Sequence, residues 1–440
     1  MSLATPPTIQ ELQRKLYLKA KQEPTYRFYA LYDKVYRDGI LVHAYHLAKA
    51  NEGAAGVDGM CFEDIEKYGV GRFLVELRQE LQERRYRPEA VLRVMIPKPN
   101  GGERPLGIPT IKDRVVQTAV KLVLEPIFEA DFTDNAYGYR PQRSAVQAVK
   151  AVHQALKAGF CQVVDADLSK YFDTIPHAEL MRSVSRRVSD GTILHLVKMW
   201  LKAPVEENND NGTRTRRGSS NRGTPQGGVL SPLLANIYMR RFLKAWEQRG
   251  LDRQFASRIV NYADDFVILC RRDAVQALGE ARRLLQRIGL MLNETKTRIC
   301  QAPYEPFDFL GYRFGVQYSF GSGREYVAAY PSGKSVCRIK DKLRRMIGTH
   351  MSWQSEGKLV GDVNRVVRGW LNYFSYGTLW KTYTKLERFL QQRLRGWLVH
   401  KHRVEGRGEC RYHAPYLYET LGLVNPCQVL AAMRTPSGGA

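Results

Sequence analysis

Three carboxylates stand where apolar strands are expected to end, and they carry the clearest potential for chemistry. Asp167 follows the apolar run 162–166, and Asp264 and Asp265 lie at a turn between two further apolar runs. Adjacent carboxylates repel each other, so this turn is unfavourable unless a cation binds to it. Three carboxylates from neighbouring strand ends form an oxygen-rich site suited to two hard divalent ions. Such ions, roughly 3.5–4 Å apart, activate a hydroxyl nucleophile and stabilise the leaving group in phosphoryl transfer.

These carboxylates need a sheet to hold them, and the apolar pattern predicts one. Short apolar strands alternate with amphipathic helices, which is typical of an α+β fold with helices packed on a sheet. The expected strands are 91–96, 162–166, 259–262, 266–270 and 309–314. The expected helices are 73–81, 143–157, 177–188, 230–248 and 273–289.

Three other segments have distinct characters. Residues 8–50 favour helix, and the polar stretch 206–223 is typical of an exposed loop or hairpin tip. Residues 331–403 also favour helix and carry 16 basic residues against four acidic ones. Aromatic side chains interleave with these charges, which indicates a helical domain that binds nucleic acid.

The composition limits the class of protein. The 440 residues include 68 Lys and Arg against 44 Asp and Glu, a net charge of +24, which implies a polyanionic partner such as nucleic acid. The seven cysteines form no C-x-x-C pair, which is typical of a reducing compartment. Cys410 and His413 are spaced like half a zinc site, but no second close pair follows. No run of 18 apolar residues occurs, so we expect an intracellular protein with no membrane partner.

The turn Tyr262-Ala263-Asp264-Asp265 resembles the central YxDD motif of reverse transcriptases. Six further blocks occur in the order found in that family, and seven ordered motifs are far more specific than any one of them. The six blocks are residues 96–109, 136–141, 167–173, 223–232, 290–297 and 309–312.

Three segments narrow the resemblance to one subfamily. Residues 56–59, 226–232 and 368–374 resemble the reverse transcriptases encoded by bacterial and organellar group II introns. That family implies a right-hand polymerase with fingers, a ferredoxin-like palm, an α-helical thumb and a helical N-terminal extension. In this chain the implied parts are the N-terminal extension at 1–60, fingers and palm at 61–325, the thumb or maturase domain at 326–404 and a short C-terminal tail at 405–440.

The resemblance also implies a role for each residue of the acidic site. Asp167 and Asp264 match the residues that bind two Mg²⁺ ions, and Leu168 matches a position that offers its backbone carbonyl. Asp265 completes the acidic cluster. Oxygen ligands alone do not distinguish magnesium from manganese, so magnesium is expected from its availability.

Five matched residues are expected to meet the incoming nucleotide. Lys98 and Arg104 match finger residues that contact the triphosphate, for which the forked guanidinium of arginine is well suited. Phe172 matches a steric gate against a ribose 2′-hydroxyl, with an ordinary core phenylalanine as the alternative. Gln226 matches the residue beside the incoming sugar. Lys296 matches a position near the pyrophosphate; for both lysines the alternative is a solvated surface residue.

Contacts to the template and primer are expected on the palm and the thumb. The candidate residues are Arg140, Gly227, Arg368, Lys381 and Lys385. Glycine at position 227 has a physical explanation, because a close backbone approach to a template or nucleotide leaves no room for a Cβ atom.

The sequence therefore predicts an RNA-directed DNA polymerase that also binds intron RNA and assists splicing and retromobility. Its expected partners are an RNA template, a DNA primer or target, and dNTPs. We expect it in the bacterial cytoplasm near the nucleoid, with an organelle as the alternative. Residues 405–440 leave no room for the H-N-H endonuclease domain of many mobile members. Two alternatives remain: a host-recruited relative in DNA repair or defence, and a maturase acting mainly as an RNA-binding protein.

Overall fold

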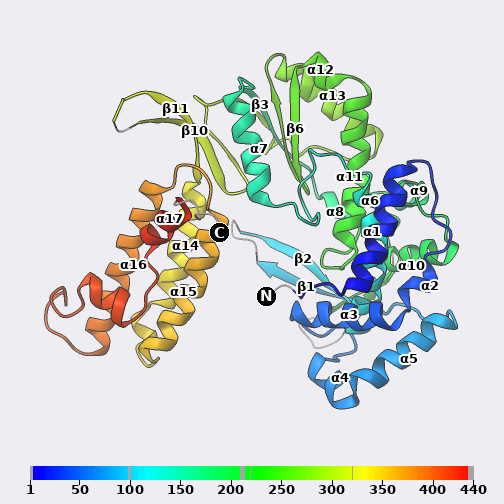
Figure 1. Cartoon of the computed structure of the whole chain (residues 1–440), viewed down its shortest axis with the longest axis horizontal. Coiled ribbons are helices and arrows are strands. Elements are labelled where there is room, and N and C mark those ends of the chain that lie inside the picture. Colours follow the sequence, from blue (N-terminus) through cyan, green and yellow to red (C-terminus); the bar gives the residue numbers. More distant parts are fainter. Residues whose placement is uncertain (1–2, 98–100, 209–213, 219, 320, 435–440) are drawn as a thin grey trace.

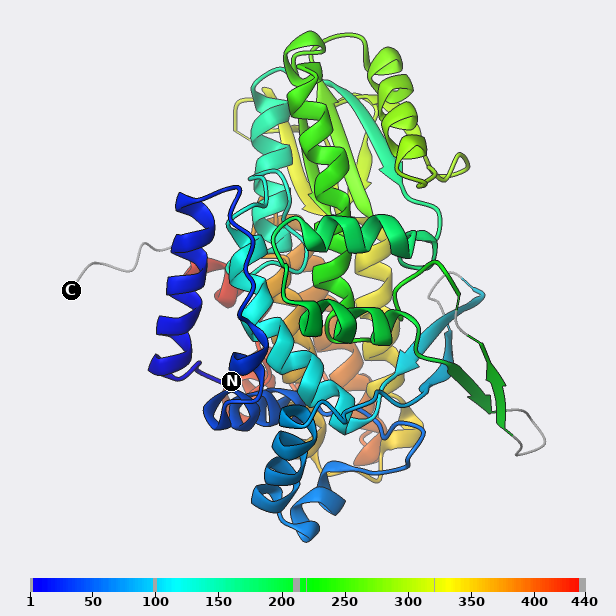
Figure 2. The same ribbon diagram turned by 90° about the vertical axis from the view of Figure 1, so that its right-hand side faces the viewer.

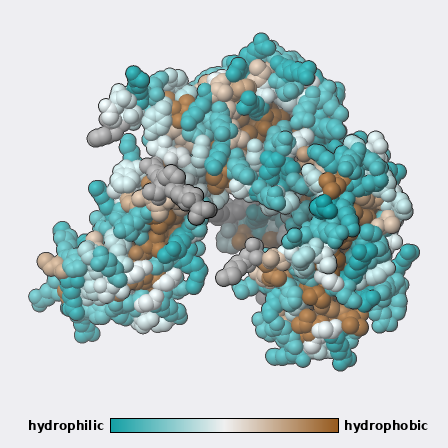
Figure 3. All heavy atoms as spheres, viewed as in Figure 1, coloured by the Kyte–Doolittle hydropathy of each residue, from teal (hydrophilic) through white to brown (hydrophobic). Residues whose placement is uncertain are grey.

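The computed structural model describes residues 3–97, 101–208, 214–218, 220–319 and 321–434. A central palm is flanked by fingers on one side and a helical thumb on the other (Figure 1). The molecule is hollowed between fingers and thumb, below the palm (Figure 3). This is the expected right-hand α+β arrangement. Across the described ranges, no helix is long and apolar enough to cross a membrane.

The palm is a four-stranded antiparallel sheet with the strand order β6-β7-β3-β8, the order of a ferredoxin-like fold. Its strands are β3 (Gln162–Asp167), β6 (Ser257–Tyr262), β7 (Asp265–Cys270) and β8 (Arg298–Gln301). Strands β3, β6 and β7 were predicted from their apolar runs. Strand β8 was not predicted, because only Cys300 among its four residues is buried and no apolar run marks it.

The two faces of the palm sheet differ in what covers them. Three helices pack on it: α7 (Ala145–Lys157), α11 (Ser231–Gln248) and α13 (Ala274–Arg287). Val164 belongs to the core that contains α11 and α13, whereas Val163 packs in a separate core with α7. Side chains alternate between the faces of a strand. Asp167 therefore lies on the α7 side, and α11 and α13 cover the opposite side.

The fingers contain a second sheet with the order β2-β1-β4-β5. Its strands are β1 (Val91–Pro97), β2 (Glu103–Ile108), β4 (Val205–Asn208) and β5 (Arg214–Arg217). The polar stretch 206–223 thus supplies a projecting hairpin, as expected (Figure 2). Because β4 pairs in parallel with β1, this hairpin also extends the sheet of the fingers.

The other helices before β9, which belong to the N-terminal region, the fingers and the palm, share one core with the palm sheet. They are α1 (Pro7–Gln22), α2 (Tyr32–Val35), α3 (Asp38–Ala50), α4 (Phe62–Tyr68), α5 (Val70–Gln82), α6 (Ile111–Glu129), α8 (Tyr171–Thr174), α9 (His177–Ser185), α10 (Gly191–Leu201) and α12 (Leu251–Gln254). Residues 8–50 are therefore three helices rather than one helical stretch. Helices α1 and α3 pack on α6, so residues 1–60 are no separate unit. Helix α6 was not predicted, because it is buried on nearly all sides and shows no amphipathic pattern.

The thumb has its own hydrophobic core and follows a small sheet with the order β11-β10-β9. The strands are β9 (Phe307–Phe309), β10 (Tyr312–Tyr318) and β11 (Glu325–Pro331). The helices are α14 (Gly333–Met346), α15 (Glu356–Tyr373), α16 (Trp380–Lys401) and α17 (Pro426–Arg434), with single turns at Thr349–Met351 and Tyr416–Thr420.

Two predicted boundaries of the thumb are wrong. Strand β11 pairs along its whole length with β10, so the helical domain begins at α14 rather than at residue 326. Leu417, Leu423 and Leu430 are buried in the thumb core. Residues 405–434 therefore complete the thumb and do not form a tail.

Candidate active site

The tight hairpin between β6 and β7 holds two of the three candidate carboxylates. Tyr262 pairs with Asp265 across the strands, so Ala263 and Asp264 alone form the turn. Ala263 has a φ of 59°, the left-handed conformation that tight hairpin turns use. Beneath the turn, the buried side chain of Asn261 donates a hydrogen bond to the Ala263 carbonyl at 2.9 Å. The backbone of the turn is thereby held in one shape.

The register of the palm sheet brings the third carboxylate to this hairpin. Asp167 lies directly opposite Asp265 in the β3–β7 ladder. Directly opposed residues in antiparallel strands have Cβ atoms about 4.5–5.5 Å apart, so their side chains can contact the same ligand. The structure therefore gathers Asp167, Asp264 and Asp265 at one end of the palm sheet.

The backbone of Leu168 adjoins the same site. The carbonyl of Asp167 accepts a hydrogen bond from the N–H of Asn293 at 2.8 Å, and Leu168 forms an isolated bridge with Leu292. Carbonyls of successive residues in an extended segment point in opposite directions. The Leu168 carbonyl therefore points away from Asn293 and toward the side of β7.

The electrostatics of the carboxylates indicate a site for cations. Loss of hydration raises the pKa of Asp265 to about 7, and the charges of Asp264 and Asp167 add to the rise. Loss of hydration also raises the pKa of Asp264, again with a contribution from Asp167. A bound cation would relieve this repulsion. In the described part of the chain, no three Asp, Glu, His or Cys side chains already have the geometry of a metal site.

Lys296 lies beside the carboxylates. Its Nζ atom is 2.8 Å from Oδ2 of Asp167, and Asn293 Nδ2 donates to the same oxygen at 3.2 Å. The hydrogen bond with Asp167 raises the pKa of Lys296, so the side chain carries its charge at neutral pH. About two thirds of the side chain is exposed, which leaves the ammonium group accessible to an anionic ligand.

Gly138 supports the acidic hairpin from below. Its carbonyl accepts a hydrogen bond from Asn236 Nδ2 at 2.7 Å. A Cβ atom added to Gly138 would lie 2.5 Å from the backbone nitrogen of Ala263, closer than side chains approach backbone. The hairpin can occupy its position only because residue 138 has no side chain.

Substitution Gly138→Ala should displace the hairpin and lower both stability and activity. We expect the unfolding free energy to fall by about 1–3 kcal/mol, the usual cost of overpacking. Primer extension should fall by about 10²-fold, because a shift of about 1 Å at a catalytic group has that effect. Gly191→Ala is the matched control, since a Cβ there meets nothing within 4 Å. Equal activities of the two variants would contradict the prediction.

A chain of hydrogen bonds links the fingers to the palm beside this site. Arg104 Nε on β2 donates to Gln226 Oε1 at 2.9 Å. Gln226 Nε2 in turn donates to both carboxylate oxygens of Asp173, at 3.1 and 3.2 Å. Asp173 and Phe172 are neighbours on the short helix α8. Two predicted nucleotide-binding residues, Arg104 and Gln226, thus contact each other directly, and Asp173, which is outside the predicted set, holds Gln226 from the other side.

The predicted steric gate lies within an aromatic group near the hairpin. Phe172 is largely buried, and its ring meets Tyr139 edge to face with centroids 6.4 Å apart. Tyr139 also lies 6.4 Å from the ring of Tyr262, which begins the acidic turn. The position beside the carboxylates agrees with a gate, and the burial agrees with a core residue; a substitution must separate these roles.

Of two predicted template contacts, Arg140 does not suit that role, and Gly227 has another reason to be glycine. Arg140 is buried and forms an ion pair with Glu129 at 2.6 Å, while its Nη1 donates to the carbonyls of Thr133 and Ala136. Its guanidinium therefore braces the loop before α7. Gly227, with a φ of 111°, lies so close to the Gly107 carbonyl that a Cβ would collide with it. Residue 227 must therefore be glycine because strand β2 passes close to it.

Three of the remaining predicted residues are exposed on helices of the thumb. Arg368 on α15 and Lys381 and Lys385 on α16 are exposed, with the apolar residues of both helices turned into the thumb core. These three cations are thus available to a phosphate backbone. Lys98 lies outside the described residues.

Sequence reasoning missed three residues that touch the predicted set: Tyr139, Asp173 and Asn293. Each stands inside a motif block that the sequence singles out. The available signal was therefore position within a motif, but their partners are fixed only by the tertiary fold.

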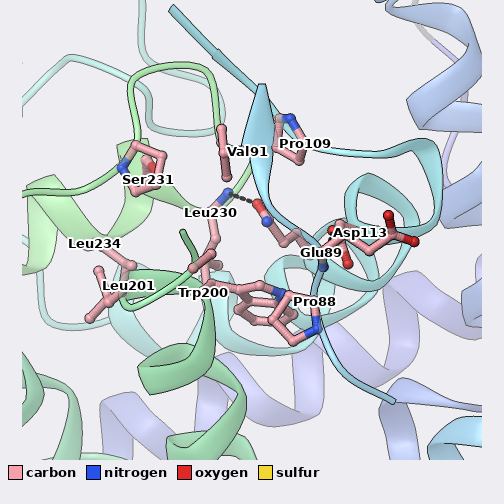
Figure 4. A pocket seen from close by; sticks show the side chains of 14 residues that line it. Pro88, Glu89, Val91, Pro109, Asp113, Trp200, Leu201, Leu230, Ser231 and Leu234 are labelled. Atoms are coloured by element: carbon pink, nitrogen blue, oxygen red, sulfur yellow. Dashed lines mark hydrogen bonds between the residues drawn. The ribbon is translucent and has the colours of Figure 1, made fainter. Parts of the chain in front are cut away.

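A small cavity lies under the loop that carries Gln226. Figure 4 shows Trp200, Pro88 and Leu230 lining it, with the Leu230 N–H hydrogen-bonded to Gln117. The buried carboxylate of Asp113 forms part of its wall, and burial raises the pKa of that group. None of the three catalytic candidates lines this cavity. It therefore belongs to the support of the loop.

Two family models match the chain. The model for reverse transcriptases (RNA-dependent DNA polymerases) matches residues 96–314, which include the three carboxylates. The model for the maturase-specific domain of group II introns matches residues 336–414 in the thumb. The chain belongs to the group II intron reverse transcriptases. This reverse transcriptase is an RNA-directed DNA polymerase with a maturase domain, of the class that acts in intron splicing and mobility.

Curated relatives agree with this assignment. Protein YkfC of Escherichia coli (strain K12) is 34% identical over 367 residues, 74% of this chain and 93% of the relative. Group II intron-encoded protein LtrA of Lactococcus lactis subsp. cremoris is 36% identical over 242 residues, 53% of this chain but only 38% of LtrA. A solved telomerase structure from Candida albicans aligns with this chain at a TM-score of 0.44 and 13% sequence identity. The alignment covers 82% of this chain and 68% of the telomerase chain. That likeness is too distant to support an argument.

Proposed function

We propose that this reverse transcriptase copies RNA into cDNA with two Mg²⁺ ions held by Asp167 and Asp264. Asp265 and the Leu168 carbonyl would complete the oxygen ligands. The convergence of three mutually repelling carboxylates on one end of the palm sheet supports this assignment. When bound, two such ions activate the 3′-hydroxyl of the primer and stabilise the leaving pyrophosphate.

Removal of divalent ions tests the proposed chemistry directly. Extension of a DNA primer on an RNA template should stop in excess EDTA and return when Mg²⁺ is restored. The reason is that EDTA removes the hard divalent cations that the carboxylates are proposed to bind. Binding of the primer–template, measured by fluorescence anisotropy, should persist in EDTA. Extension that continues in the chelator would overturn the two-metal assignment.

The residues of the fingers and palm would hold the incoming nucleotide around the carboxylates. Arg104 and Lys296 would bind the triphosphate, because both are exposed cations beside the site. Lys98 is proposed to join them. Gln226 would contact the sugar, and Phe172 would exclude a ribose 2′-hydroxyl. The chain's own contribution to the reaction is thus to orient the triphosphate and to select the sugar.

The exposed cations of the thumb are proposed to bind the RNA template and the DNA primer. The same cations would bind intron RNA during splicing, in the bacterial cytoplasm near the nucleoid. The salt dependence of affinity reports the number of phosphates that a protein neutralises. A purified protein that gave no increase in splicing at low magnesium would remove the splicing role while leaving the polymerase assignment intact.

Charge reversal on α16 tests the proposed role of the thumb. Lys381 and Lys385 are one helical turn apart on the same face. The variant Lys381→Glu/Lys385→Glu should weaken RNA binding and lower the slope of log affinity against log salt by about 2. The control Lys157→Glu/Arg253→Glu makes the same change in charge at exposed positions of the palm. Equal losses in both variants would show an effect of net charge alone.

A further inference from the structure

A basic groove lies between α9, α11 and α13, on the side of the palm turned away from the thumb (Figure 1). We call it the rear groove. Since α11 and α13 cover the sheet face opposite Asp167, the rear groove lies behind the catalytic carboxylates. Six cations line it: Arg186, Arg240, Arg241, Lys244, Arg249 and Arg287.

Acidic residues neutralise only part of this charge. Arg241 forms an ion pair with Glu179 at 2.8 Å. Arg240 lies 3.8 Å from the carboxylate of Asp131 and donates to its backbone carbonyl at 2.8 Å. Among the described residues, the other four cations have no side-chain hydrogen bond or ion pair: Arg186, Lys244, Arg249 and Arg287. The rear groove therefore has a substantial excess of positive charge.

Helix capping explains part of the pattern but not its convergence. Arg186 and Arg249 follow the last residues of α9 and α11, and Arg287 ends α13, where cations offset the helix dipole. Helix capping alone does not require the ends of these three helices to lie at the same groove. Burial, together with the charges of Arg186 and Arg187, lowers the pKa of Arg240. The groups thus repel one another, and a bound polyanion would relieve the repulsion.

We propose that the rear groove binds the phosphodiester backbone of nucleic acid that lies outside the polymerase cleft. Five of its six cations are arginines, whose forked guanidinium pairs well with phosphate oxygens. All six cations line one open groove. This surface is additional to the cleft and the thumb cations, so the proposal goes beyond the proposed function.

The test reverses two of the unpaired charges. Arg249 and Arg287 are exposed, so Arg249→Glu/Arg287→Glu should fold normally. Binding of an RNA hairpin and a DNA hairpin is measured with the cleft occupied by a primer–template duplex. We expect affinity to fall by about 10–100-fold at low salt and the salt slope to fall by about 2. The control Lys157→Glu/Arg253→Glu should retain wild-type binding, and primer extension should stay within about twofold in both variants.

The outcomes separate this inference from the polymerase assignment. Equal losses for both hairpins support recognition of backbone charge, and a loss for the RNA hairpin alone supports recognition of A-form geometry. Unchanged hairpin binding, or an equal loss in the control, overturns the proposal even if extension is normal. Unchanged hairpin binding with reduced binding of polyglutamate would assign the groove to an acidic protein instead. Arg249→Gln/Arg287→Gln gives the same comparison if charge reversal prevents folding.

Discussion

Replacement of Asp264 by asparagine should abolish primer extension while leaving the fold intact. The amide keeps the size of the carboxylate but loses the negative charge that would hold both metal ions. We expect kcat to fall by at least about 10³-fold, equivalent to about 4 kcal/mol of transition-state stabilisation. Extension of an oligo-dT primer on poly-rA measures this loss.

The stability of the same variant should not fall. The charge of Asp264 contributes to the raised pKa of Asp265, so its removal relieves repulsion in the metal-free protein. The melting temperature without divalent ions should therefore equal or exceed that of the wild type. Asp308→Asn is the control, because it makes the same chemical change on β9, where Asp308 pairs with Arg313. An active Asp264→Asn variant would show that the assignment of the acidic hairpin is wrong.

The acidic site could be predicted because its signals are local. Asp264 and Asp265 interrupt two apolar strands, and Asp167 ends a third, so strand and turn patterns alone locate all three. In the observed register Asp167 stands opposite Asp265, and paired apolar residues such as Val164 and Ile268 share one core. Three of the four palm strands and the chemistry of the site were therefore predictable, whereas β8 was not.

The errors arise where burial depends on distant parts of the chain. Arg140 stands in a motif, but only the fold shows that Glu129 and two carbonyls occupy its guanidinium. The glycine at position 227 was explained by a template contact, because the neighbour that excludes its side chain, Gly107, is more than a hundred residues away. Leu417 and Leu430 belong to segments too short to show a helical period, so they did not indicate that residues 405–434 complete the thumb core.

The link between Arg104, Gln226 and Asp173 likewise could not be predicted, because it joins three separate motif blocks. Its chemistry fixes the orientation of the Gln226 amide. Only one orientation places the carbonyl oxygen toward the Arg104 donor and the NH₂ group toward the Asp173 carboxylate. We infer that Asp173 is a positioning residue, which holds Gln226 ready for the sugar of the incoming nucleotide.

A double-mutant cycle should demonstrate this positioning. Gln226→Glu sets a carboxylate against that of Asp173, and we expect kcat/KM for dNTPs to fall by about 10²-fold through a higher KM. Asp173→Asn alone should cost about 10-fold, since the amide no longer enforces one orientation.

The combination Asp173→Asn/Gln226→Glu restores a complete network, because the new asparagine donates to the new glutamate and Arg104 still donates from the other side. The double variant should therefore be at least about 10-fold better than Gln226→Glu alone, a coupling of at least about 2.7 kcal/mol relative to the product of the two single losses. Steady-state kinetics with each dNTP at saturating primer–template measures all four proteins. If the two losses simply multiply, Asp173 does not orient Gln226, and the contact seen here has no part in selecting the nucleotide.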